Sequence, residues 1–180
     1  PAARAVERAG PAQEEFSSVT TAVVTLLETG DAAAFAKILA PSTEDWRVVV
    51  GTNRNAAGED PLDAAWQKSL THQQTRLESD ARALLAKAAE LNVDFSQLQL
   101  TGCAVTPKGI GTVRNFSFQS QKESLPWAEK LEVVVTVKPA TNTPASERLG
   151  GEYKLSVGNL TKFPAGWRAS EGARWVSFPP

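Results

Sequence analysis

The chain has 180 residues, of which 42% are hydrophobic and 22% charged, an ordinary globular composition that excludes wholesale disorder. Nineteen basic and twenty acidic residues give a net charge of −1, so no strong field favours a nucleic-acid partner. One cysteine and one histidine exclude an internal disulfide framework and argue against a histidine-rich metal site, so we expect neither metal nor cofactor. No apolar run approaches the ~20 residues of a membrane-spanning helix.

The N-terminal segment differs in composition from the rest of the chain. Residues 1–12 are rich in Ala and Pro and predict a flexible tether, followed by a single domain over residues 13–180. The sequence begins at Pro1 and contains no methionine, as in a mature exported protein, although a trimmed sequence would look the same. We therefore expect a periplasmic or secreted bacterial protein.

Apolar residues at helical spacing predict three helices. The first starts near residue 13 and ends at Gly30; the second has Asp31 as its N-cap and ends before Pro41. The third begins at Asp60 and Pro61, an N-cap followed by proline at the first helical position, and continues to Asn92.

Period-two alternation predicts the strands. The β-branched stretch Trp46–Val50 indicates a short strand, and alternation after Asn92 predicts strands near residues 98–105, 112–121, 131–138, 152–157 and 166–176, with turns at 107–109, 124–126 and 139–144. Helices followed by consecutive strands are typical of an α+β domain, with three N-terminal helices covering one face of an antiparallel sheet.

The order of these elements resembles a known superfamily. The Gly30–Asp31 step with Phe35 and Leu39, and the closing segment Tyr153–Val157 followed by Gly166–Arg168, are similar to the nuclear-transport-factor-two-like (SnoaL-like, cystatin-like cone) domains. The resemblance implies a curved antiparallel sheet, a cone-shaped α+β barrel, with a pocket between the sheet and the long helix. It implies no particular chemistry, because members include isomerases, dehydratases, ligand carriers and dimerisation modules.

Few titratable residues are placed for catalysis. His72 lies roughly 140° from the centre of the apolar stripe of the third helix, at about 100° per residue, and is expected in solvent. Asp80 lies at the edge of that stripe. Arg114 and Glu132 sit on predicted neighbouring strands, where they either line one cavity or form an ordinary exposed cross-strand pair. No catalytic residue is therefore assigned.

Aromatic residues supply the other candidates. Tryptophans at positions 46, 66, 127, 167 and 175 either pack in the core or line a binding cleft. Cys103 sits in an apolar strand and is expected to be an inert core residue. We assign the predicted ligand pocket to Trp46, Trp66, Arg114, Glu132 and Tyr153.

Two functional hypotheses follow. The first is a non-catalytic domain that binds a small apolar ligand or a protein partner, with a homodimer through the sheet as a further expectation. The alternative is an isomerase- or dehydratase-like enzyme with a buried carboxylate as general base, for which Glu132, Asp45 and Asp80 are the candidates.

Overall fold

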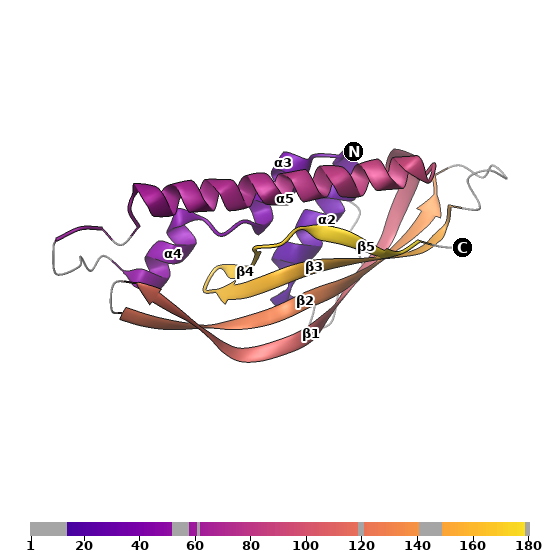
Figure 1. Ribbon diagram of the computed structural model, residues 1–180. Coiled ribbons are helices and arrows are strands. Elements are labelled where there is room, and N and C mark those ends of the chain that lie inside the picture. The colour runs from indigo at the N-terminus through magenta and orange to yellow at the C-terminus, as the bar shows by residue number, and fades with distance from the viewer. Residues whose placement is uncertain (1–13, 52–57, 61, 119–120, 141–148, 179–180) are drawn as a thin grey trace.

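The computed structural model describes residues 14–51, 58–60, 62–118, 121–140 and 149–178, so the predicted tether lies outside the described residues. N-terminal helices pack against a curved antiparallel sheet (Figure 1), which confirms the α+β class. The sheet is open, so the predicted barrel does not close. The elements are α2 (Ser17–Thr29), α3 (Ala32–Leu39), α4 (Thr43–Val50), α5 (Ala64–Glu90), the 3₁₀ turn η1 (Phe95–Gln97), β1 (Leu98–Phe118), β2 (Gln121–Pro139), β3 (Gly151–Phe163), β4 (Gly166–Ala169) and β5 (Ala173–Ser177).

The sheet curls around the first described helix. Strands β1, β2 and β3 pair in sequence order, and both short C-terminal strands pair antiparallel with β3. Helix α2 contacts both β1 and β4, and α5 runs along the helical side of the molecule above the sheet (Figure 1). The long helix therefore forms the outer cover and α2 fills the concave side.

The junction of the first two helices follows the sequence prediction. Gly30 ends α2 in the left-handed conformation with φ 69°, which glycine adopts without a Cβ penalty. The Asp31 carboxylate accepts a hydrogen bond from the Ala34 backbone N–H at 2.8 Å, as an N-cap does.

The start of the long helix was predicted three residues too early. Asp63 is the N-cap, and its carboxylate accepts from the Trp66 N–H at 2.9 Å. Asp60 instead accepts two hydrogen bonds from the Arg47 guanidinium, at 2.9 and 2.7 Å, and one from the Leu62 N–H. The guanidinium is the stronger attraction for the Asp60 carboxylate.

The predicted strand at Trp46–Val50 is wrong, because these residues belong to helix α4. Ser42 and Asp45 form a capping box in which each side chain bonds the other residue's backbone N–H. Trp46 and Val50, one helical turn apart, are both buried. A strong cap and a buried i, i+4 pair outweigh the β propensity of the valines.

Two predicted turns, at 107–109 and 124–126, are also wrong. They lie within β1 and β2, strands of 21 and 19 residues. Pro107 is tolerated because β1 is an edge strand, paired only with β2 among the described strands. Gly111 leaves room for the Trp127 indole to lie across β1, since a Cβ there would collide with the ring.

The interior is divided into two apolar clusters. The main core lies between α2, α3, α5 and the inner sheet face, and its alternating β2 residues Leu131, Val133, Val135 and Val137 are all buried. A smaller satellite core lies between α4, the start of α5 and the end of β3. Its buried members are Trp46, Val50, Leu62 and Phe163.

Candidate functional site

The structure brings two of the predicted pocket residues together in the satellite core. The Trp46 ring stands edge-on to Trp66 at 5.3 Å and to Phe163 at 4.7 Å, measured between ring centroids. These are packing geometries favoured by aromatic pairs. Trp46 and Trp66 therefore contribute to a filled apolar cluster.

Asp45 is buried beside this cluster. Its carboxylate accepts from Arg168 Nε at 3.0 Å and Nη2 at 3.2 Å, from the Ser42 hydroxyl at 2.8 Å and from the Ser42 N–H at 2.8 Å. A general base needs an oxygen that is open to a substrate proton. The Asp45 oxygens are instead occupied by these four hydrogen bonds, which connect α4 to β4.

Tyr153 lies in a different aromatic group, here called the aromatic wall: Phe95, Tyr153, Trp175 and Phe178. Its hydroxyl donates to the Leu149 carbonyl at 2.9 Å, and burial raises the pKa of the phenol. Phe95 stacks on Trp175 with 5.7 Å between centroids and 10° between planes. Tyr153 belongs to the main core, whereas Trp46 and Trp66 belong to the satellite core and its edge. The three predicted pocket residues therefore lie in two different clusters.

The two charged pocket candidates lie far apart on the sheet. Glu132 is opposite Thr106 on β1, whereas Arg114 is opposite Leu125 on β2. At about 3.4 Å per residue, Thr106 and Arg114 are roughly 27 Å apart along the strand. Glu132 lies instead 3.7 Å from Lys108 Nζ in a partly exposed pair, and the side chain of Arg114 is outside the described part.

The remaining titratable candidates have structural or exposed positions. His72 is exposed, as predicted. Asp80 is half-buried and accepts from the Gly172 N–H at 3.1 Å, which fixes the β4–β5 connection to α5. Cys103 is buried, and that burial raises the pKa of its thiol to about 11. Among the described residues no cluster of His, Cys, Asp or Glu forms a metal site.

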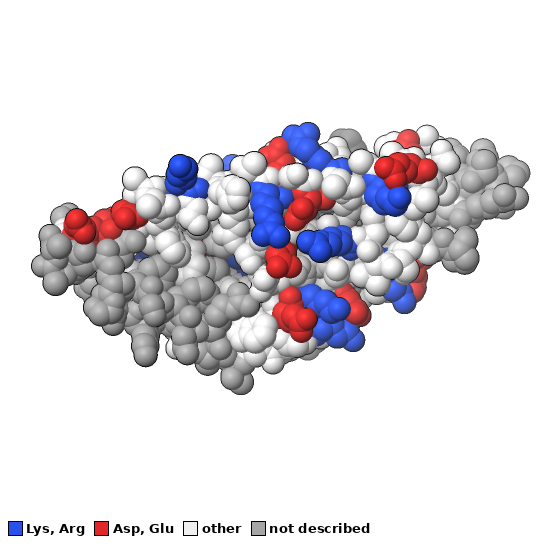
Figure 2. Space-filling view, in the orientation of Figure 1, with Lys and Arg blue, Asp and Glu red and all other residues white. Residues whose placement is uncertain are grey.

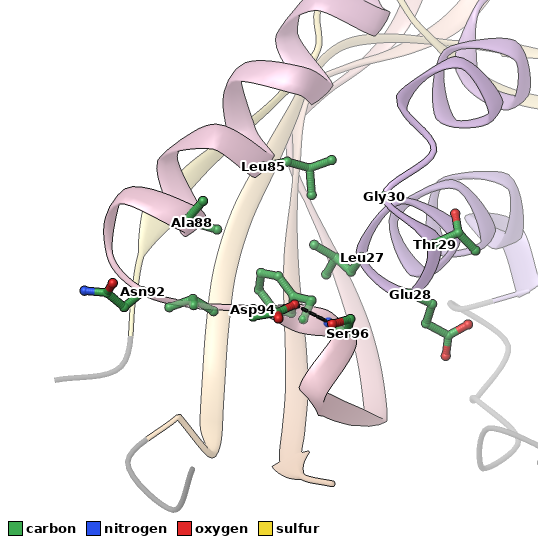
Figure 3. Close-up of a pocket in the computed structure, with 12 residues that line it drawn as sticks. Leu27, Glu28, Thr29, Gly30, Leu85, Ala88, Asn92, Asp94 and Ser96 are labelled. Carbon is green, nitrogen blue, oxygen red and sulfur yellow. Dashed lines mark hydrogen bonds between the residues drawn. The ribbon is translucent and has the colours of Figure 1, made fainter. Parts of the chain in front are cut away.

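An open pocket lies at the C-terminal end of α5. This end pocket has a volume of about 570 Å³ and is formed by the ends of α2 and α5 and by η1. In Figure 3 the side chains of Leu27 and Leu85 face the space between the helices, whereas Glu28 and Thr29 point away from it. Leu27 and Leu85 form its apolar floor together with Ala88, Val93 and Phe95.

The polar groups of the end pocket are mostly engaged. Asp94 accepts from the Ser96 hydroxyl at 2.6 Å and the Ser96 N–H at 2.9 Å (Figure 3). These two bonds lower the pKa of Asp94. The lining includes no His, Cys, Lys or Arg, so its surface mixes apolar and polar groups and its titratable side chains are the carboxylates of Glu28 and Asp94.

Charge over the surrounding surface is mixed. Basic and acidic side chains alternate across the face that carries α5 and β5 (Figure 2). Such a face produces no extended field of one sign. In the described part of the chain, no helix is long and apolar enough to cross a membrane.

Comparisons with known protein families, with curated proteins and with solved structures found no match for this chain.

Sequence reasoning missed every residue of the end pocket. Its floor combines residues of α2, α5 and η1 that are far apart in the chain. The one local signal was the helix end itself. Asn92 adopts a positive φ of 57°, and Asp94 followed two residues later by Ser96 is typical of a side-chain-capped turn. Such a signal marks where α5 stops but gives no indication of a cavity.

Proposed function

We propose that this protein is a non-catalytic ligand-binding domain whose site is the end pocket. The observation that carries this proposal is the pocket's lining: an apolar floor, a volume of about 570 Å³, and two titratable side chains, of which Glu28 points away from the space (Figure 3) and Asp94 is held by Ser96. Ligand sites are typically concave, largely apolar and furnished with a few polar groups. The ligand class that fits is a small, uncharged and mainly apolar molecule.

The enzymatic alternative has less support. Of its three candidate bases, Asp45 is held by Arg168 and Ser42, Asp80 by the Gly172 N–H, and Glu132 is partly exposed beside Lys108. Glu132, Asp45 and Asp80 line no part of the end pocket. Export, a homodimer through the sheet and kinship with the nuclear-transport-factor-two-like domains remain predictions.

Two exposed alanines of α5 provide a matched test. Ala89 lines the end pocket. Ala86 lies on the solvent face, roughly 170° from the centre of the buried stripe at about 100° per residue. A tryptophan at position 89 would fill the pocket, whereas a tryptophan at position 86 would add the same ring on a part of the helix that does not line the pocket.

The experiment is a titration with uncharged fragments, indole and cyclohexanol, followed by amide chemical shifts. We expect shifts concentrated at residues 27–30 and 88–96, lost in Ala89→Trp and kept in Ala86→Trp. Shifts that persist in Ala89→Trp, or that cluster elsewhere, would reject the end pocket as the site.

A further inference from the structure

A second concave site lies on the other flank of α5. This α5–β5 groove has a volume of about 430 Å³, and the residues that line it include Asp80, Ala83 and Lys87 of α5, Arg174 and Val176 of β5, and Phe178. Its α5 residues lie about 140° around the helix from those of the end pocket, at roughly 100° per residue. The two sites are therefore separated by the buried stripe of the helix.

The groove presents apolar surface to solvent. Val176 is 56% exposed, and Phe178 and Trp175 are half-buried along the β5 side. Trp175 is held in place because its indole N–H donates to the Leu84 carbonyl at 2.8 Å. Trp175 and Phe178, the two members of the aromatic wall that line the groove, thus give it an apolar floor that a ligand would cover with little reorganisation.

The charged groups of the groove favour an anion. Its lining has two cations, Lys87 and Arg174, and one carboxylate, Asp80, which already accepts from the Gly172 N–H. Lys87 pairs with Glu90 at 2.8 Å, but both side chains are more than half exposed, so the pair is weak. Arg174 is exposed and presents a planar fork that matches a carboxylate.

We propose that the α5–β5 groove binds an apolar molecule carrying one carboxylate, with Arg174 as the main contact for the carboxylate and Lys87 as the lesser one. The apolar chain lies along Ala83, Val176 and Phe178. This is a site additional to the end pocket and of different ligand chemistry. It uses charge complementarity, which the end pocket, without Lys or Arg in its lining, does not offer to an anion.

Calorimetric titration of the full chain with decanoate tests the proposal, with decyltrimethylammonium as a probe of equal chain length and opposite charge. We expect decanoate to bind and the cation not to bind. Arg174→Gln should weaken decanoate roughly tenfold, as loss of a charge-assisted contact does, and Lys87→Gln less. Arg82→Gln, which removes an exposed cation of α5 outside the groove, should leave the affinity unchanged.

The alanine series locates the site. Ala83→Trp fills the groove and should abolish decanoate binding, whereas Ala86→Trp and Ala89→Trp should retain it. Equal binding of both probes, an equal loss in Arg82→Gln, or decanoate binding that survives Ala83→Trp would each overturn the proposal. A further result would also overturn it: the protein self-associates in sedimentation, Ala83→Trp abolishes that self-association, and decanoate does not bind. A second copy of the chain would then occupy the groove. Failure of uncharged fragments at the end pocket, with decanoate bound in the groove, would reject the proposed function alone.

Discussion

Aromatic side chains pack around both ends of helix α5, but the N-terminal end is closed and the C-terminal end borders open sites. At its N-terminal end, Trp46, Trp66 and Phe163 pack edge to face, and the Asp45–Arg168 ion pair is buried beside them. At its C-terminal end, Phe95 and Trp175 stack, but each also borders an open site. Aromatic residues therefore do not by themselves mark a pocket. Room is left where the ends of α2 and α5 meet η1.

The largest expected effect is at the closed end. Asp45→Ala should lower the free energy of unfolding by about 3–5 kcal/mol, because it leaves the Arg168 guanidinium buried without its partner and removes the capping box of α4. The side chains of Arg168 and Asp45 are only 16% and 3% exposed. Urea denaturation followed by circular dichroism measures the change.

A matched surface pair provides the control. Glu78 and Arg82 are 2.6 Å apart on α5, with the Arg82 side chain 69% exposed. Glu78→Ala should change the free energy of unfolding by no more than about 0.5 kcal/mol. If Asp45→Ala cost as little as Glu78→Ala, the N-terminal end of α5 would not be a closed core and the contrast between the two ends would disappear.

The second effect concerns the sealed region between the two ends. Cys103 faces the main core from β1, and burial raises its thiol pKa from 9.0 to about 11. Because the unfolded chain then releases the thiol proton at a lower pH than the folded one, the folded state is favoured fully below pH 9 and loses this contribution as the pH rises through 11. The loss amounts to roughly 2–3 kcal/mol.

Unfolding free energies measured at pH 8, 9.5 and 11 for the parent and for Cys103→Ala separate this contribution from other groups that titrate in the same range. The parent should lose more stability between pH 8 and 11 than the variant does, and its thiol should react slowly with a disulfide reagent at pH 8. Parallel pH profiles for the two proteins would mean that solvent reaches the thiol and that the middle of the core is not sealed.

The success of the sequence reasoning depended on the range of the interactions involved. The Gly30–Asp31 helix junction and the alternating row from Leu131 to Val137 were predicted correctly, because one backbone turn and one pleat period determine them. The segment Trp46–Val50 was misread because its valines were weighed without the local capping box of Ser42 and Asp45 and without the bond between Asp45 and Arg168, residues 123 positions apart. No local propensity contains that contact.

The same limit applies to the strands and the site. Pro107 and Gly109 indicated a turn, yet an edge strand tolerates both, and edge position is a property of the whole sheet. Trp46 and Trp66 were predicted to line a ligand pocket, and in the structure they pack edge-on in a filled apolar cluster. The end pocket and the groove are spaces between helices and strands that are far apart in the chain. A sequence pattern predicts single helices and strands, so it does not predict the spaces between them.

The smallest expected effect is at the open end. Trp175→Phe keeps an aromatic ring in the wall but removes the hydrogen bond from the indole N–H to the Leu84 carbonyl. That carbonyl still accepts a bond within the helix ladder of α5, so the free energy of unfolding should fall by only about 0.5–1.5 kcal/mol. Urea denaturation measures it directly. A loss above about 3 kcal/mol would mean that the aromatic wall is packed as tightly as a core. The surroundings of the C-terminal end of α5 would then be as closed as the satellite core, and the contrast between the two ends would fail.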